Sequence, residues 1–341
     1  MSTRQATKYI FTRVKNAKFR YIPRRFHAFK PTPILLEKKE PQTPSILGLI
    51  DKPFTQLPKR KSFRFITGAS AKPKSTDLPI IPRPVDPYIS IQVGEDAFFQ
   101  RYDSMGVADG VGGWADVKGN SFIIDGANPA LYSLKLMHYA GQELEKYDDF
   151  SGEIDLTLPD YNSVSPKDIL KKSYELVNSD AKKENIVGST TEDELRIANI
   201  GDCAVMVIRG GEPIFRSEEQ QHSFNFPFQL GTVSRDSPND TQTFTVKIQE
   251  GDIVVLGSDG LFDNVFDEEI VDIIATHTHS NIQISDPQLM ADALLQKARA
   301  VAEDNRYATS PFQNRAIQEG FYYQGGKVDD MTVLVGIIRY L

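Results

Sequence analysis

The 341-residue sequence predicts a mixed fold of the α+β class, in which helices cover the faces of β-sheets. Two patterns lead to this prediction. Proline follows a capping residue at the start of several segments that have one apolar face, which is typical of helix N-termini. Short segments rich in Val and Ile lie between glycines or charged turns, as strands do. Because some of these segments are apolar at every position, we expect both faces of their sheets to be covered.

Five helices are predicted from the start signals and from apolar residues that recur on one helical face. Residues Leu131, Leu134 and Met137 show this recurrence in the first of them. The predicted starts are Asn128-Pro129, Ser165-Pro166, Asp267, Asp286-Pro287 and Ser310-Pro311.

Strands are predicted before and between these helices. The first is Ser62–Ala71, which follows a proline-rich region and marks the start of the folded domain. The others span residues 195–201, 203–210, 243–248, 252–258 and 331–338.

The N-terminal segment, residues 1–36, contains nine Lys or Arg and no acidic residue. It lacks the continuous apolar core of a secretory signal. Its composition is that of a mitochondrial transit peptide, and the alternative is a basic tail that is disordered or binds a membrane surface or RNA. Residues 37–87 hold nine of the 20 prolines, so we assign residues 37–61 to a linker and residues 62–341 to the folded domain.

The body of the chain is acidic. Nine of the 39 basic residues lie in residues 1–36, so the other 30 face all 46 acidic residues, a net charge of −16. Nucleic-acid binding needs a basic face, so we expect no nucleic-acid partner. No apolar run approaches the roughly 18 residues of a membrane span, so we expect no transmembrane segment. The single cysteine, Cys203, excludes an internal disulfide.

Acidic residues recur at the edges of the predicted strands, mostly next to glycine. They are Glu95, Asp96, Asp109, Asp202, Asp259, Asp263, Asp329 and Asp330. A single aspartate in a turn usually bonds its own backbone, which is the alternative for each site alone. Carboxylates at several strand ends can instead converge, and they then repel one another unless cations neutralise them. Carboxylates, backbone carbonyls and water suit Mg²⁺ or Mn²⁺.

A site of this composition with two metal ions suits the hydrolysis of phosphate esters. The chain has no P-loop, which argues against ATP-driven transfer. None of the five histidines lies beside an acidic motif, so zinc is disfavoured.

A cysteine phosphatase is the alternative suggested by Arg209, six residues after Cys203. The residues between them are all apolar and predict a strand. A phosphate-binding loop needs backbone N–H groups that a strand uses for pairing. We therefore expect Cys203 to be a small buried residue.

The order of the motifs resembles the metal-dependent protein phosphatases of type 2C. The motifs are Glu-Asp at 95–96, Asp-Gly-x-Gly-Gly at 109–113, Gly-Ser-Thr at 188–190, Gly-Asp at 201–202, Ser-Asp-Gly-x-x-Asp at 258–263 and Asp-Asp-Met-Thr-Val at 329–333. Residues 108–114 and 216–230 resemble the mitochondrial branch of that family, which is linked to coenzyme Q biosynthesis. The resemblance implies a four-layer α-β-β-α sandwich, with two antiparallel sheets flanked by helices.

The resemblance also implies roles for the acidic residues. Asp109 would bridge two Mg²⁺ or Mn²⁺ ions, with the Gly110 carbonyl and Glu95 as further ligands and Asp96 holding ligand waters. Asp259 and Asp329 would complete the first ion. Asp202 and Asp263, with Asp259, correspond to a weaker third site. A water activated between the two ions, held through Asp109, Asp259 and Asp329, would attack phosphoserine or phosphothreonine in mitochondrial proteins.

Three departures from the family pattern bear on this reading. Val111 stands where the common family has a histidine that is proposed as general acid. The stretch Tyr88–Asp96 lacks the family's phosphate-binding arginine. After Thr191 the chain is about one strand short, through a deletion or a real shortening. These departures support the alternative of a weak or inactive member that acts as a phosphoprotein-binding scaffold.

The partners and the cell compartment follow from the same resemblance. We expect phosphoprotein substrates, a monomer, and a location in the mitochondrial matrix.

Overall fold

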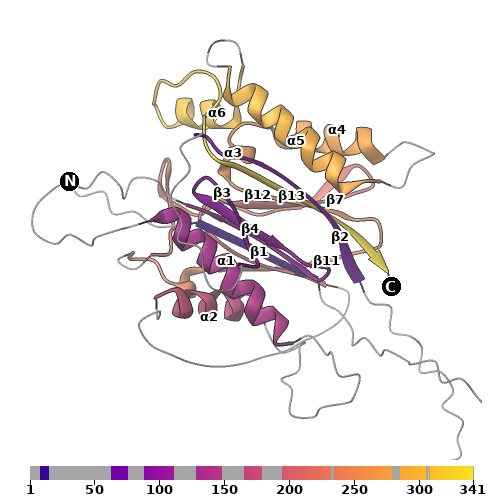
Figure 1. The fold of residues 1–341 in the computed structure, drawn as a ribbon. Helices are drawn as coiled ribbons and strands as arrows, with labels where there is room; N and C mark the ends of the chain where they lie inside the picture. Colours follow the sequence, from indigo (N-terminus) through magenta and orange to yellow (C-terminus); the bar gives the residue numbers. More distant parts are fainter. Residues whose placement is uncertain are drawn as a thin grey trace, which may run out of the picture.

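The computed structural model describes the backbone of residues 8–14 and the structure of residues 63–75, 88–110, 128–147, 165–178, 194–231, 234–278, 285–304, 306 and 308–340. Within these ranges two sheets lie face to face, with helices on both outer sides (Figure 1). All of the strand pairs in the two sheets are antiparallel. The predicted α+β class is confirmed.

The first sheet has six strands in the order β11-β6-β1-β5-β4-β3. Their bounds are Gln242–Lys247, Glu194–Ile200, Lys8–Val14, Ser104–Asp109, Asp96–Gln100 and Ile91–Val93, in that order. Helices α1 (Pro129–Glu145) and α2 (Pro166–Asn178) cover its outer face (Figure 1).

The second sheet has five strands in the order β2-β13-β12-β7-β8. Their bounds are Phe63–Lys72, Met331–Tyr340, Ile253–Gly257, Ala204–Arg209 and Glu212–Arg216. Helices α4 (Asp267–Thr278), α5 (Pro287–Ala302) and α6 (Pro311–Gln318) lie on its side of the molecule (Figure 1). The short helix α3 (Asp259–Phe262) follows β12, and β9 (Gln221–Ser223) pairs with β10 (Phe226–Pro227) outside both sheets.

The helix starts read from the sequence are confirmed by their caps. The Asn128 side chain accepts a hydrogen bond from Leu131 N at 3.0 Å. Asp286 and Ser310 accept corresponding bonds from Gln288 N and Gln313 N. Each of these side chains satisfies a backbone donor that has no partner within its helix.

Two apolar cores explain why the strands read as continuous apolar runs. One core lies between the sheets and extends beneath α5, and the other lies between the first sheet and helices α1 and α2. Strand β4 contributes Phe98 to the first core and Phe99 to the second. Successive side chains of a strand point to opposite faces, so a sheet covered on both sides needs apolar residues at consecutive positions.

Strand β1 was not foreseen in the sequence, where its residues lie inside the expected targeting segment. It pairs with β5 on one side and with β6 on the other. β6, the first described strand after Thr191, therefore lies between β1 and β11. Thr191 itself and the linker of residues 37–61 lie outside the described residues.

Among the described helices, none combines the length and the apolar character needed to cross a bilayer.

The buried ring of His138 gives the fold a defined response to pH. Ile89 N donates to His138 Nδ1 at 3.1 Å, which ties the chain before β3 to helix α1. Burial lowers the pKa of His138 below its ordinary value of 6.5. The folded protein therefore binds fewer protons than the unfolded chain in the window below pH 6.5. The contribution of this ring to stability is present above pH 6.5 and is lost as the pH falls toward the lowered pKa.

We expect His138→Asn to remove this pH-dependent component, because asparagine can accept the Ile89 bond without titrating. Urea unfolding at pH 8 and pH 5.5 measures it. The wild type should lose more of its free energy of unfolding between these pH values than the variant does. An equal loss in both proteins would show that His138 does not carry the effect.

Candidate metal centre

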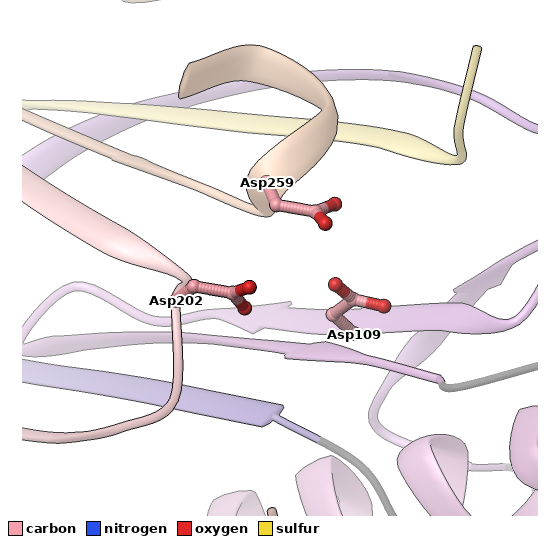
Figure 2. Close-up of side chains that lie close together, drawn as sticks. All are labelled: Asp109, Asp202 and Asp259. Carbon is pink, nitrogen blue, oxygen red and sulfur yellow. The ribbon is translucent and has the colours of Figure 1, made fainter. Parts of the chain in front are cut away.

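Three aspartates converge between the ends of the two sheets. Asp109 ends β5, Asp202 follows β6, and Asp259 begins α3 directly after β12. One carboxylate oxygen from each lies within 4.8 Å of the other two. The three side chains point toward one another, as Figure 2 shows. Their exposed fractions are 6%, 5% and 3%, so water screens their mutual repulsion poorly.

This donor set fits hard divalent cations. All three ligand atoms are carboxylate oxygens, which suit Mg²⁺ and Mn²⁺ better than softer metals. Buried carboxylates at this spacing need positive charge nearby if they are to stay ionised. The predicted convergence of Asp109, Asp202 and Asp259 is therefore seen in the structure.

Lys327 supplies positive charge to this cluster. Its Nζ donates to Asp259 Oδ2 and to Asp263 Oδ2, each at 2.6 Å, and lies 3.5 Å from Asp329 Oδ2. The lysine side chain is only 14% exposed. An ammonium group among these carboxylates shows that their arrangement accommodates a cation.

Asp263 does not belong to the group of three converging aspartates, although Lys327 Nζ bonds both Asp263 and Asp259. Arg315 Nη2 and Lys327 Nζ both donate to its carboxylate. Asp202 lies instead with Asp109 and Asp259. The structure thus groups Asp202 with the predicted bridging residue, and it groups Asp263 with two cationic side chains.

Glu95 and Asp329 are joined by a second lysine. Lys74 Nζ lies 3.1 Å from both Glu95 Oε2 and Asp329 Oδ1. Burial opposes the charge on Lys74, but Asp329, Asp330 and Glu95 outweigh burial and raise its pKa above the usual range. Burial raises the pKa of Glu95, and the charge of Lys74 opposes this effect.

Asp330 holds the segment around Glu95 in place. Its Oδ2 accepts from Glu95 N at 2.9 Å, and its Oδ1 accepts from Lys74 N at 2.7 Å. Gly94 has φ +59°, and a Cβ there would collide with the Asp330 carboxylate. A glycine is needed at this position for both reasons. Asp330 is therefore a positioning residue for Glu95.

Asp96 lies deeper than Glu95 and links the two sheets. It begins β4, and its Oδ2 accepts from Thr332 Oγ1 on β13 at 2.8 Å. Burial raises the pKa of Asp96 well above its ordinary value, and the nearby charge of Asp330 adds to the rise. A cation nearby would favour the ionised form of this carboxyl group.

A glycine is required at position 110 for a structural reason, in addition to the expected contact of its carbonyl with a metal ion. A Cβ at this position would overlap the Glu95 carbonyl. The absence of a side chain therefore lets the Glu95 backbone lie directly against the end of β5. Val111 and the Gly-Ser-Thr stretch at 188–190 lie outside the described residues.

The cysteine-phosphatase alternative is wrong. Cys203 is buried, and Arg209 lies at the end of strand β7. Arg209 Nε and Nη2 donate to the two oxygens of Asp252 at 2.8 and 2.7 Å. This bidentate pair commits the guanidinium to a structural contact.

Sequence reasoning missed the cationic residues of the centre. Lys327 could have been found, because it stands two residues before Asp329 in the Gly-Gly-Lys-Val-Asp-Asp stretch. Lys74 and Arg315 carry no comparable signal, since they are distant in sequence from the acids that they contact.

The comparisons with known proteins place this centre in a family. The family described as Stage II sporulation protein E (SpoIIE) matches residues 161–336. "Probable protein phosphatase 2C 55" of Arabidopsis thaliana is 37% identical over 248 residues, which cover 72% of this chain. The chain spans about half, 48%, of that protein's length. The X-ray structure of the photosystem II phosphatase PBCP superposes with a TM-score of 0.57 at 28% identity, over 81% of this chain and all of that chain. The protein belongs to the protein phosphatase 2C family.

A more particular likeness is to the proteins named "Protein phosphatase PTC7 homolog". The Homo sapiens protein is 36% identical over 259 residues, which cover 72% of this chain and 79% of that protein. The Danio rerio protein is also 36% identical, over 267 residues, which cover 72% of this chain and 81% of that one.

Replacing Lys327 by methionine should destabilise the protein when no divalent cation is present. The loss of one partner leaves buried carboxylates without their counter-charge, which costs about 3 kcal/mol. Thermal melts in EDTA measure this loss, and saturating Mn²⁺ should reduce it.

Lys247→Met is the matched control, because Lys247 pairs with Glu194 at the surface and its side chain is 75% exposed. Its effect should stay below about 1 kcal/mol. A K327M protein that melts in EDTA like the wild type would contradict the stabilising role of Lys327.

Gly110→Ala should displace the Glu95 backbone and weaken binding of Mn²⁺ at the centre. Forcing an extra methyl into packed structure costs about 1–3 kcal/mol. Gly141→Ala is the control, because a Cβ there would meet only the Ile89 side chain, at 3.2 Å, and not the Glu95 backbone. Isothermal titration with Mn²⁺ compares the two variants, and equal affinities would show that the contact between Gly110 and Glu95 does not shape the centre.

Proposed function

We propose that this chain is a protein serine/threonine phosphatase that depends on Mg²⁺ or Mn²⁺. The observation that carries the proposal is the convergence of Asp109, Asp202 and Asp259 in a member of the protein phosphatase 2C family. Phosphoserine and phosphothreonine in proteins are the proposed substrates.

The carboxylates would hold two ions, with Asp109 shared between them. Asp109 is near Asp259, and the next residue, Gly110, lies against the Glu95 backbone, which supports this assignment. Asp259 and Asp329 would complete one ion, Glu95 and the Gly110 carbonyl the other, and Asp202 and Asp263 a weaker third. When bound, such ions lower the pKa of water and stabilise the negative charge of a phosphoryl group.

The chain itself supplies positive charge beside these carboxylates. Lys74 and Lys327 lie on either side of Asp329, with Nζ–O distances of 3.1 and 3.5 Å. Divalent ions at the carboxylates would compete with both ammonium groups, which could then contact phosphate oxygens. This charge would offset the absence of an arginine in Tyr88–Asp96.

Asp96 and Asp330 act through position. Asp330 orients Glu95 by accepting a hydrogen bond from the Glu95 backbone N–H. Asp96 fixes β4 against β13 by accepting a hydrogen bond from the Thr332 hydroxyl. These contacts would hold the ligands in place without an approach to the substrate. The alternative, a phosphoprotein-binding scaffold of weak or no activity, rests on Val111, on the missing arginine and on the short segment after Thr191.

We propose that the protein works in the mitochondrial matrix as a monomer. The basic, acid-free residues 1–36 and the resemblance to the mitochondrial branch support this location. Residues 37–61 would act as a linker. The link of that branch to coenzyme Q biosynthesis makes proteins of that process candidate substrates.

Asp109→Asn should abolish metal-dependent hydrolysis of a phosphopeptide. Loss of one carboxylate charge at the shared position should lower kcat/KM by at least about a hundredfold. The assay uses the full chain with and without millimolar Mn²⁺, with p-nitrophenyl phosphate as a second substrate.

Asp240→Asn is the control, because Asp240 is an exposed aspartate that caps a turn at Ser237. It should keep wild-type activity. A folded wild type that binds Mn²⁺ but hydrolyses neither substrate would favour the scaffold, and full activity in D109N would refute the proposed site.

A further inference from the structure

We propose that residues 8–14 form a permanent strand of the catalytic domain, and that the slot between β5 and β6 is a groove built to bind this segment. The segment would then remain in the working protein instead of being removed as a leader. The inference rests on backbone pairing and does not depend on the proposed phosphatase activity.

The pairing of β1 is continuous on both sides. Six residue pairs join it to β5, from Lys8 opposite Asp109 to Arg13 opposite Ser104. Another six join it to β6, from Tyr9 opposite Ile200 to Val14 opposite Leu195. The strand therefore occupies an interior position of the six-stranded sheet and not an edge.

Removing β1 would divide the first sheet into two parts. Strands β11 and β6 would form one part, and β5, β4 and β3 the other. β5 is buried along its whole length in the intact sheet, and without β1 its backbone groups on that side would lose their partners. The division would also affect the helices, because α1 packs on β4 and β5 while α2 packs on β6.

Direct pairing of β5 with β6 would not restore the arrangement. Both strands run antiparallel to β1, so they are parallel to each other. Closing the slot would move one relative to the other by a strand spacing of about 4.8 Å. Asp109 ends β5 and Asp202 follows β6, so the shift would bring these two carboxylates closer together and change their spacing from Asp259.

The sequence of the segment suits this place. Lys-Tyr-Ile-Phe-Thr-Arg-Val is rich in β-branched and aromatic residues, which favour strands. In the described residues β6, the first strand after Thr191, has β1 as its partner on one side and β11 on the other.

This inference restricts how the targeting segment can be processed. Residues 1–36 can direct import and also supply β1 only if any cleavage occurs before Lys8. N-terminal sequencing of the protein recovered from mitochondria tests this directly. A folded protein that begins after Val14 would overturn the inference.

Hydrogen exchange of the full chain and of a variant that lacks residues 1–14 tests the slot itself. We expect amides of β5 and β6 to exchange about tenfold faster or more in the shortened protein. Strands β12 and β13 of the second sheet are the internal reference, and deletion of residues 2–6 is the control. Unchanged protection of β5 and β6 in the shortened protein would overturn the inference.

If the shortened protein does not fold, proline substitutions in the full chain test the pairing of β1 instead. Ile10→Pro removes a ladder donor from the middle of β1, whereas Lys18→Pro lies beyond the strand. The first should lower the melting temperature and the second should not. Equal melting temperatures for I10P, K18P and the wild type would overturn the inference.

Adding the missing segment as a separate peptide tests whether the slot binds it. A synthetic peptide of residues 5–17 should restore protection of β5 and β6 in the shortened protein, and its scrambled counterpart should not. Restoration by both peptides, or by neither when the shortened protein is folded, would contradict a groove specific for this segment.

Discussion

Repulsion among buried carboxylates is the constraint on which the rest of this structure depends. Asp109, Asp202 and Asp259 come from two different sheets and lie within 4.8 Å of one another at their ligand atoms. In a poorly screened space such a cluster is stable only with positive charge in contact. Lys327 supplies such charge at Asp259, and Lys74 supplies it to Glu95 and Asp329 nearby. The cluster suits divalent cations for the same reason.

The position of these carboxylates depends in turn on the continuity of the first sheet. Asp109 and Asp202 lie on either side of the slot that β1 occupies, so the separation between them is set by a strand that begins at residue 8. A segment whose composition indicates targeting thus also determines the geometry of the metal centre. A change in the pairing of the sheet would therefore move the candidate ligands, because they lie directly at the ends of strands.

Much of the fold was predictable because its signals are local. Asn128, Asp286 and Ser310 cap helices through bonds to residues two or three positions away, and the strands that face two cores show continuous apolar runs. Strand β1 could not be predicted in the same way. Its partners are some 100 and 190 residues away, and its basic composition indicates a different role when read alone. Lys74 was missed for the same reason, since it meets Glu95 and Asp329 only after folding.

The sequence by itself determined the chemical character of the protein: the acidic residues that suit hard cations, the family, and the elements that carry these residues. These properties follow from residue type and short-range spacing, which folding does not alter. The tertiary structure alone decided which aspartates meet, which lysines neutralise them and which segment fills the first sheet. Those outcomes depend on contacts between distant parts of the chain, where packing and the pairing of buried backbone groups choose among segments that local patterns cannot rank.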